Sequence, residues 1–180
     1  VLAEALCTWF GKKGFKAFDC FAGDTVFGYV AGTVGMDFTG IELRKEQAEL
    51  NNKRVKKDKL KARYINDDAL NMDKHIKDGT MDFFFTCPPY ADMEKYSDLK
   101  EDLSNMDHDD FFDIYRECLT NTYSKLKDNR FAVVVVSEVR GPGGSFISLV
   151  PKTVGIMLRA GYKYYNEMIL LNCVGTLAMR

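Results

Sequence analysis

The sequence lacks the features that define several large classes of protein. Its five cysteines include no Cys-x-x-Cys pair and its two histidines stand apart, which argues against a zinc site and against a disulfide framework. No apolar run is long enough to span a membrane, and no signal peptide is visible. Lysine plus arginine (25) nearly balance aspartate plus glutamate (26), so any contact with nucleic acid must use local patches. Thiols scattered through apolar runs favour a reducing, cytoplasmic compartment.

Internal repeats, low-complexity tracts and Pro/Ser-rich linkers are also missing. We therefore expect one domain, residues 1–180, and the helix-like start without an initiator methionine indicates a fragment of a longer chain. Strand-like and helix-like stretches alternate, which predicts an α/β fold with a mostly parallel central sheet flanked by helices. Strands are predicted over residues 16–21, 38–43, 63–66, 81–86, 131–136 and 162–171. Helices are predicted over residues 25–35 and 44–59, from Asp107 onward, and over residues 146–160 with a late start because of Pro151.

The most informative stretch is Thr86-Cys87-Pro88-Pro89-Tyr90, which follows an apolar predicted strand. Proline has no backbone donor and cannot continue a central strand, so the chain leaves the sheet here in a rigid turn. The turn presents a tyrosine at the end of the strand. In an open α/β sheet, this edge is where ligands bind.

Three acidic residues fall at the ends of the first three predicted strands: Asp19, Glu42 and Asp68. The corresponding ends of parallel strands share one edge of a sheet, so we expect the three carboxylates to line one crevice. Glu42 comes 19 residues after Gly23. That is the usual distance from a glycine turn to a carboxylate that binds a pair of ribose hydroxyls.

Taken together, these motifs resemble those of the amino-methylating DNA methyltransferases, the N4-cytosine and N6-adenine enzymes that use S-adenosylmethionine. The segment Phe18-Asp19-Cys20-Phe21-Ala22-Gly23 is similar to their donor loop, and Thr86-Cys87-Pro88-Pro89-Tyr90 is similar to their catalytic Ser/Asn/Asp-Pro-Pro-Tyr turn. The resemblance covers nearly the whole chain. It is strongest to phage-type members without a separate recognition domain, which implies the cytoplasm of a bacterial or phage-infected cell.

The resemblance implies a Rossmann-like methyltransferase fold that binds S-adenosylmethionine, with no metal and no membrane contact. Asp19, Ala22 and Gly23 would lie against the methionine moiety, Glu42 would hold the ribose, and Asp68 would bind the adenine amine. Phe21 and Thr86 would complete the donor site. The acceptor would be a base flipped out of DNA, with the Pro88 carbonyl and the Cys87 side chain accepting from its amino group. Pro89 would fix the turn, Tyr90 would stack on the base, and Tyr96 and Ser97 would contact the substrate.

The sequence departs from the family pattern at three places. Cys20 replaces a proline, and Asp24-Thr25 replaces Ser-Gly, which adds a negative charge near the donor. Cys87 is a weaker acceptor than Ser, Asn or Asp, unless a lowered pKa ionises it. The family also closes its sheet with an antiparallel hairpin, of which residues 162–171 would be one arm and the other would be missing after Arg180.

Two alternatives to a DNA methyltransferase stay open. One is an enzyme that methylates RNA or a protein glutamine. The other is an inactive donor-fold module for DNA binding or scaffolding, which the departures from the family pattern at Cys87 and Asp24 suggest. A basic stretch over residues 53–63 is either a solvated face or a DNA-backbone contact, and Glu138 and Arg140 follow the fifth strand on the ligand-binding edge. The choice between cytosine and adenine, the target sequence and the oligomeric state are not decided by the sequence.

Overall fold

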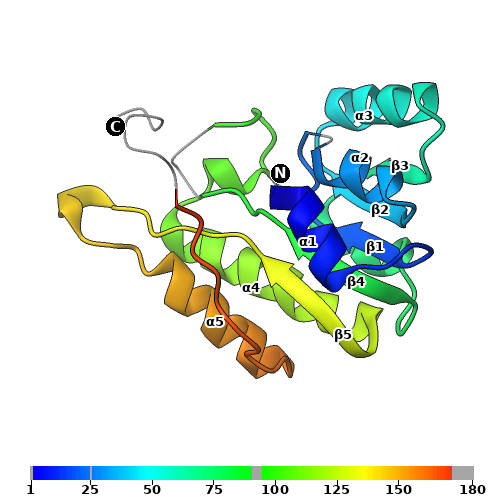
Figure 1. The fold of residues 1–180 in the computed structure, drawn as a ribbon. Coiled ribbons are helices and arrows are strands. Elements are labelled where there is room, and N and C mark those ends of the chain that lie inside the picture. Colours follow the sequence, from blue (N-terminus) through cyan, green and yellow to red (C-terminus); the bar gives the residue numbers. More distant parts are fainter. Residues whose placement is uncertain (1, 25, 91–94, 172–180) are drawn as a thin grey trace.

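The protein has an α/β fold built on a five-stranded parallel sheet (Figure 1). A computed structural model describes residues 2–24, 26–90 and 95–171. The strands are β1 (Lys16–Asp19), β2 (Asp37–Glu42), β3 (Ala62–Asn66), β4 (Met81–Thr86) and β5 (Leu126–Val134). Their order across the sheet is β3-β2-β1-β4-β5, so the order reverses between β1 and β4. Open sheets of this kind bind ligands at the carboxyl side of such a reversal.

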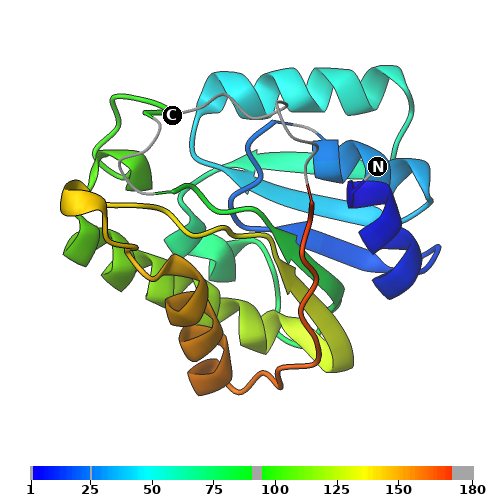
Figure 2. The ribbon, with the colours of Figure 1, turned by 60° about the vertical axis from the view of Figure 1, so that its left-hand side comes forward.

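Helices cover both faces of the sheet (Figures 1 and 2). The α-helices are α1 (Leu2–Phe10), α2 (Val26–Thr33), α3 (Lys45–Lys57), α4 (His108–Lys125) and α5 (Leu149–Ala160). Two short 3-10 helices matter for the site: η1 (Ala69–Lys74) and η3 (Leu103–Asn105). In the part of the chain that the structure describes, no helix is both long and apolar enough to cross a lipid bilayer.

Alternation along the strands divides the interior into two hydrophobic cores. On β4, Phe83 and Phe85 point to the core beneath α1, α2 and α3, while Phe84 points to the core beneath η1, α4 and α5. All six residues of β4 are buried, as expected of a parallel strand covered on both faces. On β1, Ala17 and Phe18 divide between the same two cores.

Several predicted element boundaries are confirmed, and that of β5 is shifted. Strand β4 has the predicted bounds, and Asp107 caps α4 by accepting from the amides of Asp109 and Asp110. Pro151 lies in the first turn of α5, where no helical amide bond is lost. Strand β5 begins five residues earlier than predicted, because α4 runs directly into it at Leu126 and the ladder with β4 is interrupted before Phe131.

The predicted strand over residues 162–171 is wrong. Glycine 161 ends α5, and the residues that follow extend past β5 without forming a ladder with any described strand (Figure 2). Ring contacts and a side-chain hydrogen bond tie this segment to the body. The rings of Tyr165 and Phe131 have centroids 5.2 Å apart, and the hydroxyl oxygens of Tyr162 and Thr122 lie 2.9 Å apart. Strand β5 is therefore an edge of the described sheet, and the antiparallel arm expected there does not form within it.

Candidate active site

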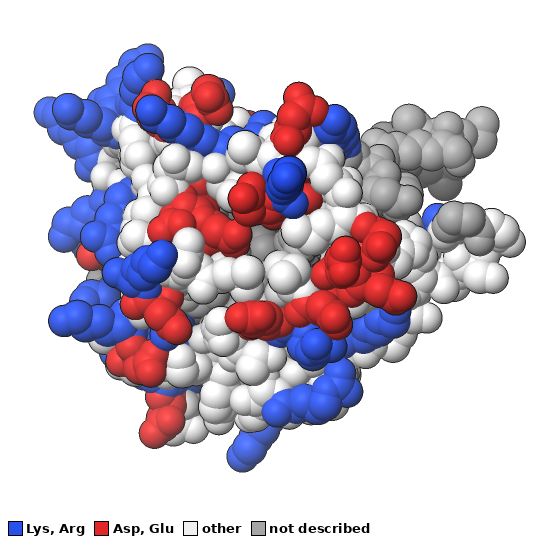
Figure 3. Space-filling view, turned by 180° about the vertical axis from the view of Figure 1, so that it is seen from behind, with Lys and Arg blue, Asp and Glu red and all other residues white. Residues whose placement is uncertain are grey.

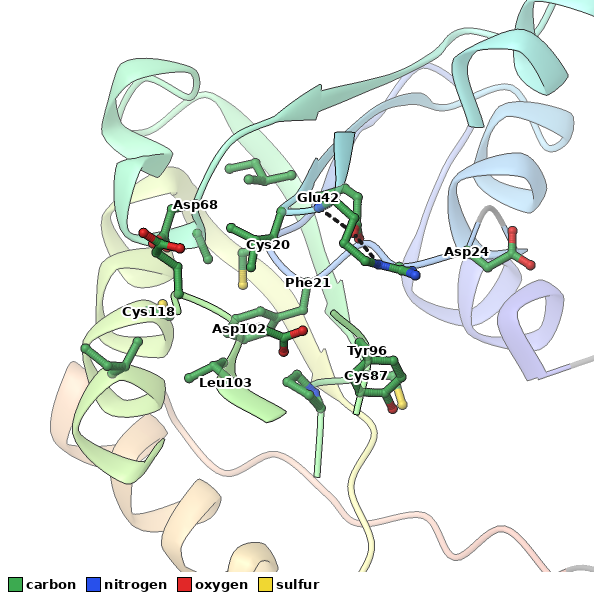
Figure 4. A pocket seen from close by; sticks show the side chains of 18 residues that line it. Cys20, Phe21, Asp24, Glu42, Asp68, Cys87, Tyr96, Asp102, Leu103 and Cys118 are labelled. Carbon is green, nitrogen blue, oxygen red and sulfur yellow. Dashed lines mark hydrogen bonds and ion pairs between the residues drawn. The ribbon is translucent and has the colours of Figure 1, made fainter. Parts of the chain in front are cut away.

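A cavity of about 360 Å³ opens at the carboxyl ends of the central strands (Figure 4). It brings together residues from both halves of the predicted site. The predicted site residues that line it are Phe21, Gly23, Glu42, Asp68, Cys87, Pro89 and Tyr96. The donor loop, the two downstream carboxylates and the Pro-Pro turn thus share one cavity, as the resemblance implies.

The other predicted site residues lie behind or beside this lining: Asp19, Ala22, Thr86, Pro88, Tyr90 and Ser97. Asp19 is buried at the end of β1, where its Oδ1 accepts from the Phe21 amide at 2.9 Å and from Thr86 Oγ1 at 2.6 Å. Burial raises the pKa of Asp19 to about 7, against the lowering effect of these two hydrogen bonds. Asp19 therefore ties the donor loop to the end of β4.

Ala22 packs the donor loop against β2. Its amide donates to the Ile41 carbonyl at 2.9 Å, and a Cβ built on Gly40 would lie 2.8 Å from the Ala22 Cβ. Only glycine at position 40 lets the loop pack so closely on β2. Gly23 has a φ of 50°, and its carbonyl accepts from Asn51 Nδ2 at 2.8 Å. The shape of the loop is thus set by two glycines and one buried asparagine of α3.

Glu42 and Asp68 each keep one carboxylate oxygen for a ligand. Glu42 Oε1 accepts from the Arg44 amide at 2.9 Å and from Arg44 Nε at 3.2 Å (Figure 4). Asp68 Oδ1 caps η1 by accepting from the Leu70 amide at 2.9 Å. The second oxygen of each carboxylate has no hydrogen-bond partner among the described residues and is not buried. Carboxylate acceptors of this kind suit the hydroxyls and amine of a nucleoside.

The departure at Asp24 is partly offset by its surroundings. Asp24 lines the cavity, but its Oδ1 pairs with Arg54 at 2.5 Å and accepts from Gln47 Nε2 at 3.4 Å. Both partners come from α3, so the extra negative charge is shared with a guanidinium instead of facing the cavity alone. Thr25, the other half of this departure, lies outside the described residues.

The thiol of Cys87 is neutral at physiological pH. Cys87 is the exposed residue that begins the turn after β4. Desolvation raises the pKa of its thiol, which outweighs a hydrogen bond with Tyr90 that lowers it. Ionisation of Cys87 through a lowered pKa, which the sequence left open, is therefore not supported. Tyr90 itself is hydrogen-bonded to Ser137, the third residue after β5.

Several cavity residues were missed from the sequence: Arg44, Glu101, Asp102, Ile114 and Cys118. Asp102 caps η3 by accepting from the amide and the hydroxyl of Ser104, and its other oxygen accepts from Ser97 Oγ at 2.7 Å. The spacing Asp102-x-Ser104 is a capping signal that could have identified this turn. Ser97 is engaged there instead of in the cavity. Ile114 and Cys118 are one helical turn apart on α4, and nothing local marks that face as a cavity wall.

The basic stretch predicted from the sequence lies mainly on the second half of α3 and the turn after it. Its lysines and arginines are exposed: Lys53, Arg54, Lys56, Lys57, Lys59, Lys61 and Arg63. A view from behind shows positive side chains gathered at the margin over α3, while acidic groups are spread across the middle of the face (Figure 3). Because α3 runs away from the end of β2, most of this stretch lies toward the opposite edge of the sheet from the cavity; Arg54 is the exception, since it pairs with Asp24 of the cavity lining.

Searches of family models and of curated proteins find no match to this chain. Solved structures do match it. The phosphoethanolamine N-methyltransferase 2 of Haemonchus contortus, in complex with S-adenosyl-L-methionine, superposes with a TM-score of 0.62 at 15% identity over 89% of this chain and 36% of that one. A TehB-like SAM-dependent methyltransferase of Corynebacterium glutamicum gives 0.60 at 15% identity over 88% and 71%.

TrmN of Thermus thermophilus matches with a TM-score of 0.55 at 18% identity, over 69% of this chain and 34% of that one. The matched part of this chain therefore spans about a third of the length of TrmN. Identities this low show the fold alone. The chain has the α/β Rossmann-like fold of S-adenosylmethionine-dependent methyltransferases.

Proposed function

We propose that this chain is an S-adenosylmethionine-dependent methyltransferase that acts on an exocyclic amino group of a base in DNA. One observation carries the proposal: a single cavity at the switch point of the sheet holds Glu42 and Asp68 together with Cys87 and Pro89. The first pair has the chemistry of a nucleoside site. The second pair belongs to the turn that resembles the amino-methyltransferase motif.

The residues present fit the donor. Phe21 and Gly23 form the loop beside the cavity, the open oxygen of Glu42 suits the ribose hydroxyls, and that of Asp68 suits the adenine amine. Arg44 holds Glu42 by two hydrogen bonds to one oxygen, which orients the other oxygen. When bound, S-adenosylmethionine supplies an electrophilic methyl group on a sulfonium.

The catalytic turn would act on the acceptor amine by hydrogen bonding. The lone pair of such an amine is delocalised into the ring, so acceptors for its hydrogens favour its attack on carbon. The Pro88 carbonyl and the neutral Cys87 thiol are the acceptors at this place. The new N–C bond forms as the S–C bond breaks. The nitrogen then releases a proton to water, because the Cys87 thiol, whose pKa is raised, is already protonated and cannot accept it. Tyr90 would stack on the base.

The two alternatives lead to different substrates. Methylation of RNA or of a protein glutamine would use the same acceptors, although the glutamine enzymes of this type carry Asn where this chain has Cys87. An inactive module would bind DNA or a partner without turnover. The ion pair between Asp24 and Arg54 weakens one of the two arguments for an inactive module, because it offsets the added negative charge.

The experiment incubates the protein with isotopically labelled S-adenosylmethionine and unmethylated DNA, then identifies the nucleosides by mass after digestion. Labelled N4-methylcytosine or N6-methyladenine supports the proposal and names the base. A Pro89→Ala variant is the control and should transfer no label, because the turn loses its rigidity. Label found only on RNA or protein, or saturable donor binding without any transfer, contradicts the proposal.

A further inference from the structure

A short hairpin, residues 140–146, projects at the carboxyl side of the sheet between β5 and α5 (Figures 1 and 2). Arg140 and Phe146 form an antiparallel bridge at its base, and the Gly141 amide donates to the Ser145 carbonyl at 2.9 Å. Gly143 and Gly144 have φ values of 83° and 80°, which other residues adopt only with strain. The tip is therefore a defined turn that depends on its glycines.

The hairpin presents a stacked cation and aromatic ring to solvent. The guanidinium carbon of Arg140 lies 4.4 Å from the centroid of the Phe146 ring, and Arg140 Nη1 donates to the Gly144 carbonyl at 2.5 Å. The Phe146 residue is 54% exposed, although phenylalanine usually packs inside a protein. Both side chains are thus held in place before any partner binds.

The segment that leads from β5 to this pair contacts the catalytic turn. The Val135 amide donates to the Thr86 carbonyl at 2.9 Å, and Ser137 is hydrogen-bonded to Tyr90. Arg140 follows Ser137 by three residues, so their Cα atoms are at most about 11 Å apart. A Cβ on Gly141 would lie 3.5 Å from the His108 Cε1 atom, so the hairpin also rests on the start of α4.

The cavity lining is mostly acidic, which disfavours the approach of a nucleic-acid backbone. The lining contains five carboxylates and a single guanidinium, from Asp24, Glu42, Asp68, Glu101, Asp102 and Arg44. The first turn of α4 adds Asp109 and Asp110. These groups repel phosphates. Apart from Arg54, which is paired with Asp24, the basic stretch of α3 lies toward the other edge of the sheet. A nucleic-acid strand whose base enters the cavity therefore needs a cation at the rim.

Glu138, by contrast, faces inward. Its Oε1 accepts from the Val150 amide at 3.0 Å, in the first turn of α5, and its Oε2 is buried without a hydrogen-bond partner among the described residues. Of the two residues that the sequence placed on this edge, only Arg140 is directed to solvent.

We propose that Arg140 and Phe146 form the DNA contact beside the catalytic turn, with Arg140 on a backbone phosphate and Phe146 stacked on an unpaired base next to the acceptor. The inference rests on the proposed function, because a flipped base leaves unstacked neighbours. Aromatic rings bind bases through their faces, and arginine binds phosphate through its planar guanidinium.

The test measures DNA affinity by fluorescence anisotropy with a labelled duplex that holds one mismatch. Phe146→Leu should weaken the Kd about ten- to hundredfold, the usual loss for one stacked base. Arg140→Gln keeps a donor for the Gly144 carbonyl but loses the charge. It should weaken the Kd and reduce the slope of log K against log salt by about 1.

Two matched variants control for the loss of an exposed ring and of an exposed cation. Trp9→Leu on α1, where Trp9 is 64% exposed, and Lys56→Gln on α3 should leave DNA affinity unchanged. Calorimetry with S-adenosylmethionine should give the same donor Kd for all four variants, which shows that the fold is intact.

The outcomes separate this inference from the proposed function. Wild-type protein that methylates DNA, with an unchanged DNA Kd in Phe146→Leu and Arg140→Gln, overturns the hairpin contact and leaves the function standing. Equal losses in the Trp9→Leu and Lys56→Gln controls also overturn it. Wild-type protein that binds its donor but neither binds nor methylates DNA overturns both.

Discussion

Thr86 Oγ1 donates a hydrogen bond of 2.6 Å to Asp19 Oδ1, and this contact joins the ends of β1 and β4. The two residues are 67 positions apart in the sequence, and both are buried. The same aspartate oxygen accepts from the Phe21 amide of the donor loop. One carboxyl group therefore sets the position of the proposed donor loop relative to the proposed catalytic turn.

Replacement of Asp19 by Asn should stabilise the free protein at alkaline pH. Burial raises the pKa of Asp19 from 3.8 to about 7, so the folded state holds a proton that the unfolded state has lost between these values. The protonated form of Asp19 therefore stabilises the folded protein fully below about pH 4. This stabilisation is lost as the pH rises through 7. A rise of the pKa from 3.8 to about 7 corresponds to at most about 4 kcal/mol of folding free energy. Asparagine has no charge to bury and can still accept from Thr86 and Phe21.

Urea unfolding of Asp19→Asn and wild-type protein at about pH 4 and pH 8 measures this effect. The variant should gain stability relative to wild type at the higher pH, with little difference at the lower. An equal difference at both values would show that Asp19 is ionised in the folded protein.

Loss of the Thr86 hydroxyl should destabilise the protein. Thr86→Val keeps the shape of the side chain but leaves the Asp19 carboxyl without its buried donor, at a cost of about 1–3 kcal/mol. Thr33→Val is the matched control, because the Thr33 hydroxyl donates to the Tyr29 carbonyl at an exposed position of α2. Chemical unfolding should separate the two variants, and equal losses would contradict a special role for the Asp19–Thr86 bond.

Glu42→Gln should weaken donor binding about ten- to hundredfold, as expected for loss of a charge-assisted hydrogen bond. The glutamine keeps an acceptor for Arg44, so the loop should keep its shape. Glu49→Gln, on the exposed face of α3, is the control and should bind S-adenosylmethionine as wild type does. Titration calorimetry gives both constants. An unchanged Kd in Glu42→Gln would remove the ribose contact from the site.

Substitutions at Cys87 should rank by the strength of the acceptor they leave. Cys87→Ser introduces a stronger acceptor and should retain or raise kcat, whereas Cys87→Ala should lower it about tenfold. Single-turnover rates with excess enzyme measure the transfer itself. Because the pKa of the Cys87 thiol is raised, iodoacetamide should also alkylate it more slowly than glutathione at neutral pH. A faster alanine variant would exclude the side chain from the reaction.

Local sequence patterns were sufficient for the elements whose structure is local. Strand β4 was predicted with its true bounds because three consecutive phenylalanines are followed, after two further residues, by two prolines. The carboxylates Glu42 and Asp68 were placed correctly in the cavity because parallel strands bring their ends to one edge. The late start of α5 followed from Pro151.

The failures concern features that depend on distant partners. Residues 162–171 have the composition of a strand, but a strand needs a neighbour to pair with, and none of the described strands takes that place. Strand β5 begins early because α4 leads straight into it, although its first residues are polar and exposed. The cavity wall of Ile114 and Cys118 depends on how α4 is laid on the sheet, which no local pattern encodes.

The position of β4 between β1 and β5 has a consequence for synthesis of the chain. Its three consecutive phenylalanines leave the ribosome after β1 but about 40 residues before β5, and parallel partners cannot pair through a tight turn. During that interval one edge of a strand that carries three phenylalanines has no partner. Nascent chains that end before α4 should therefore bind holdase chaperones and aggregate, and chains that extend through β5 should not.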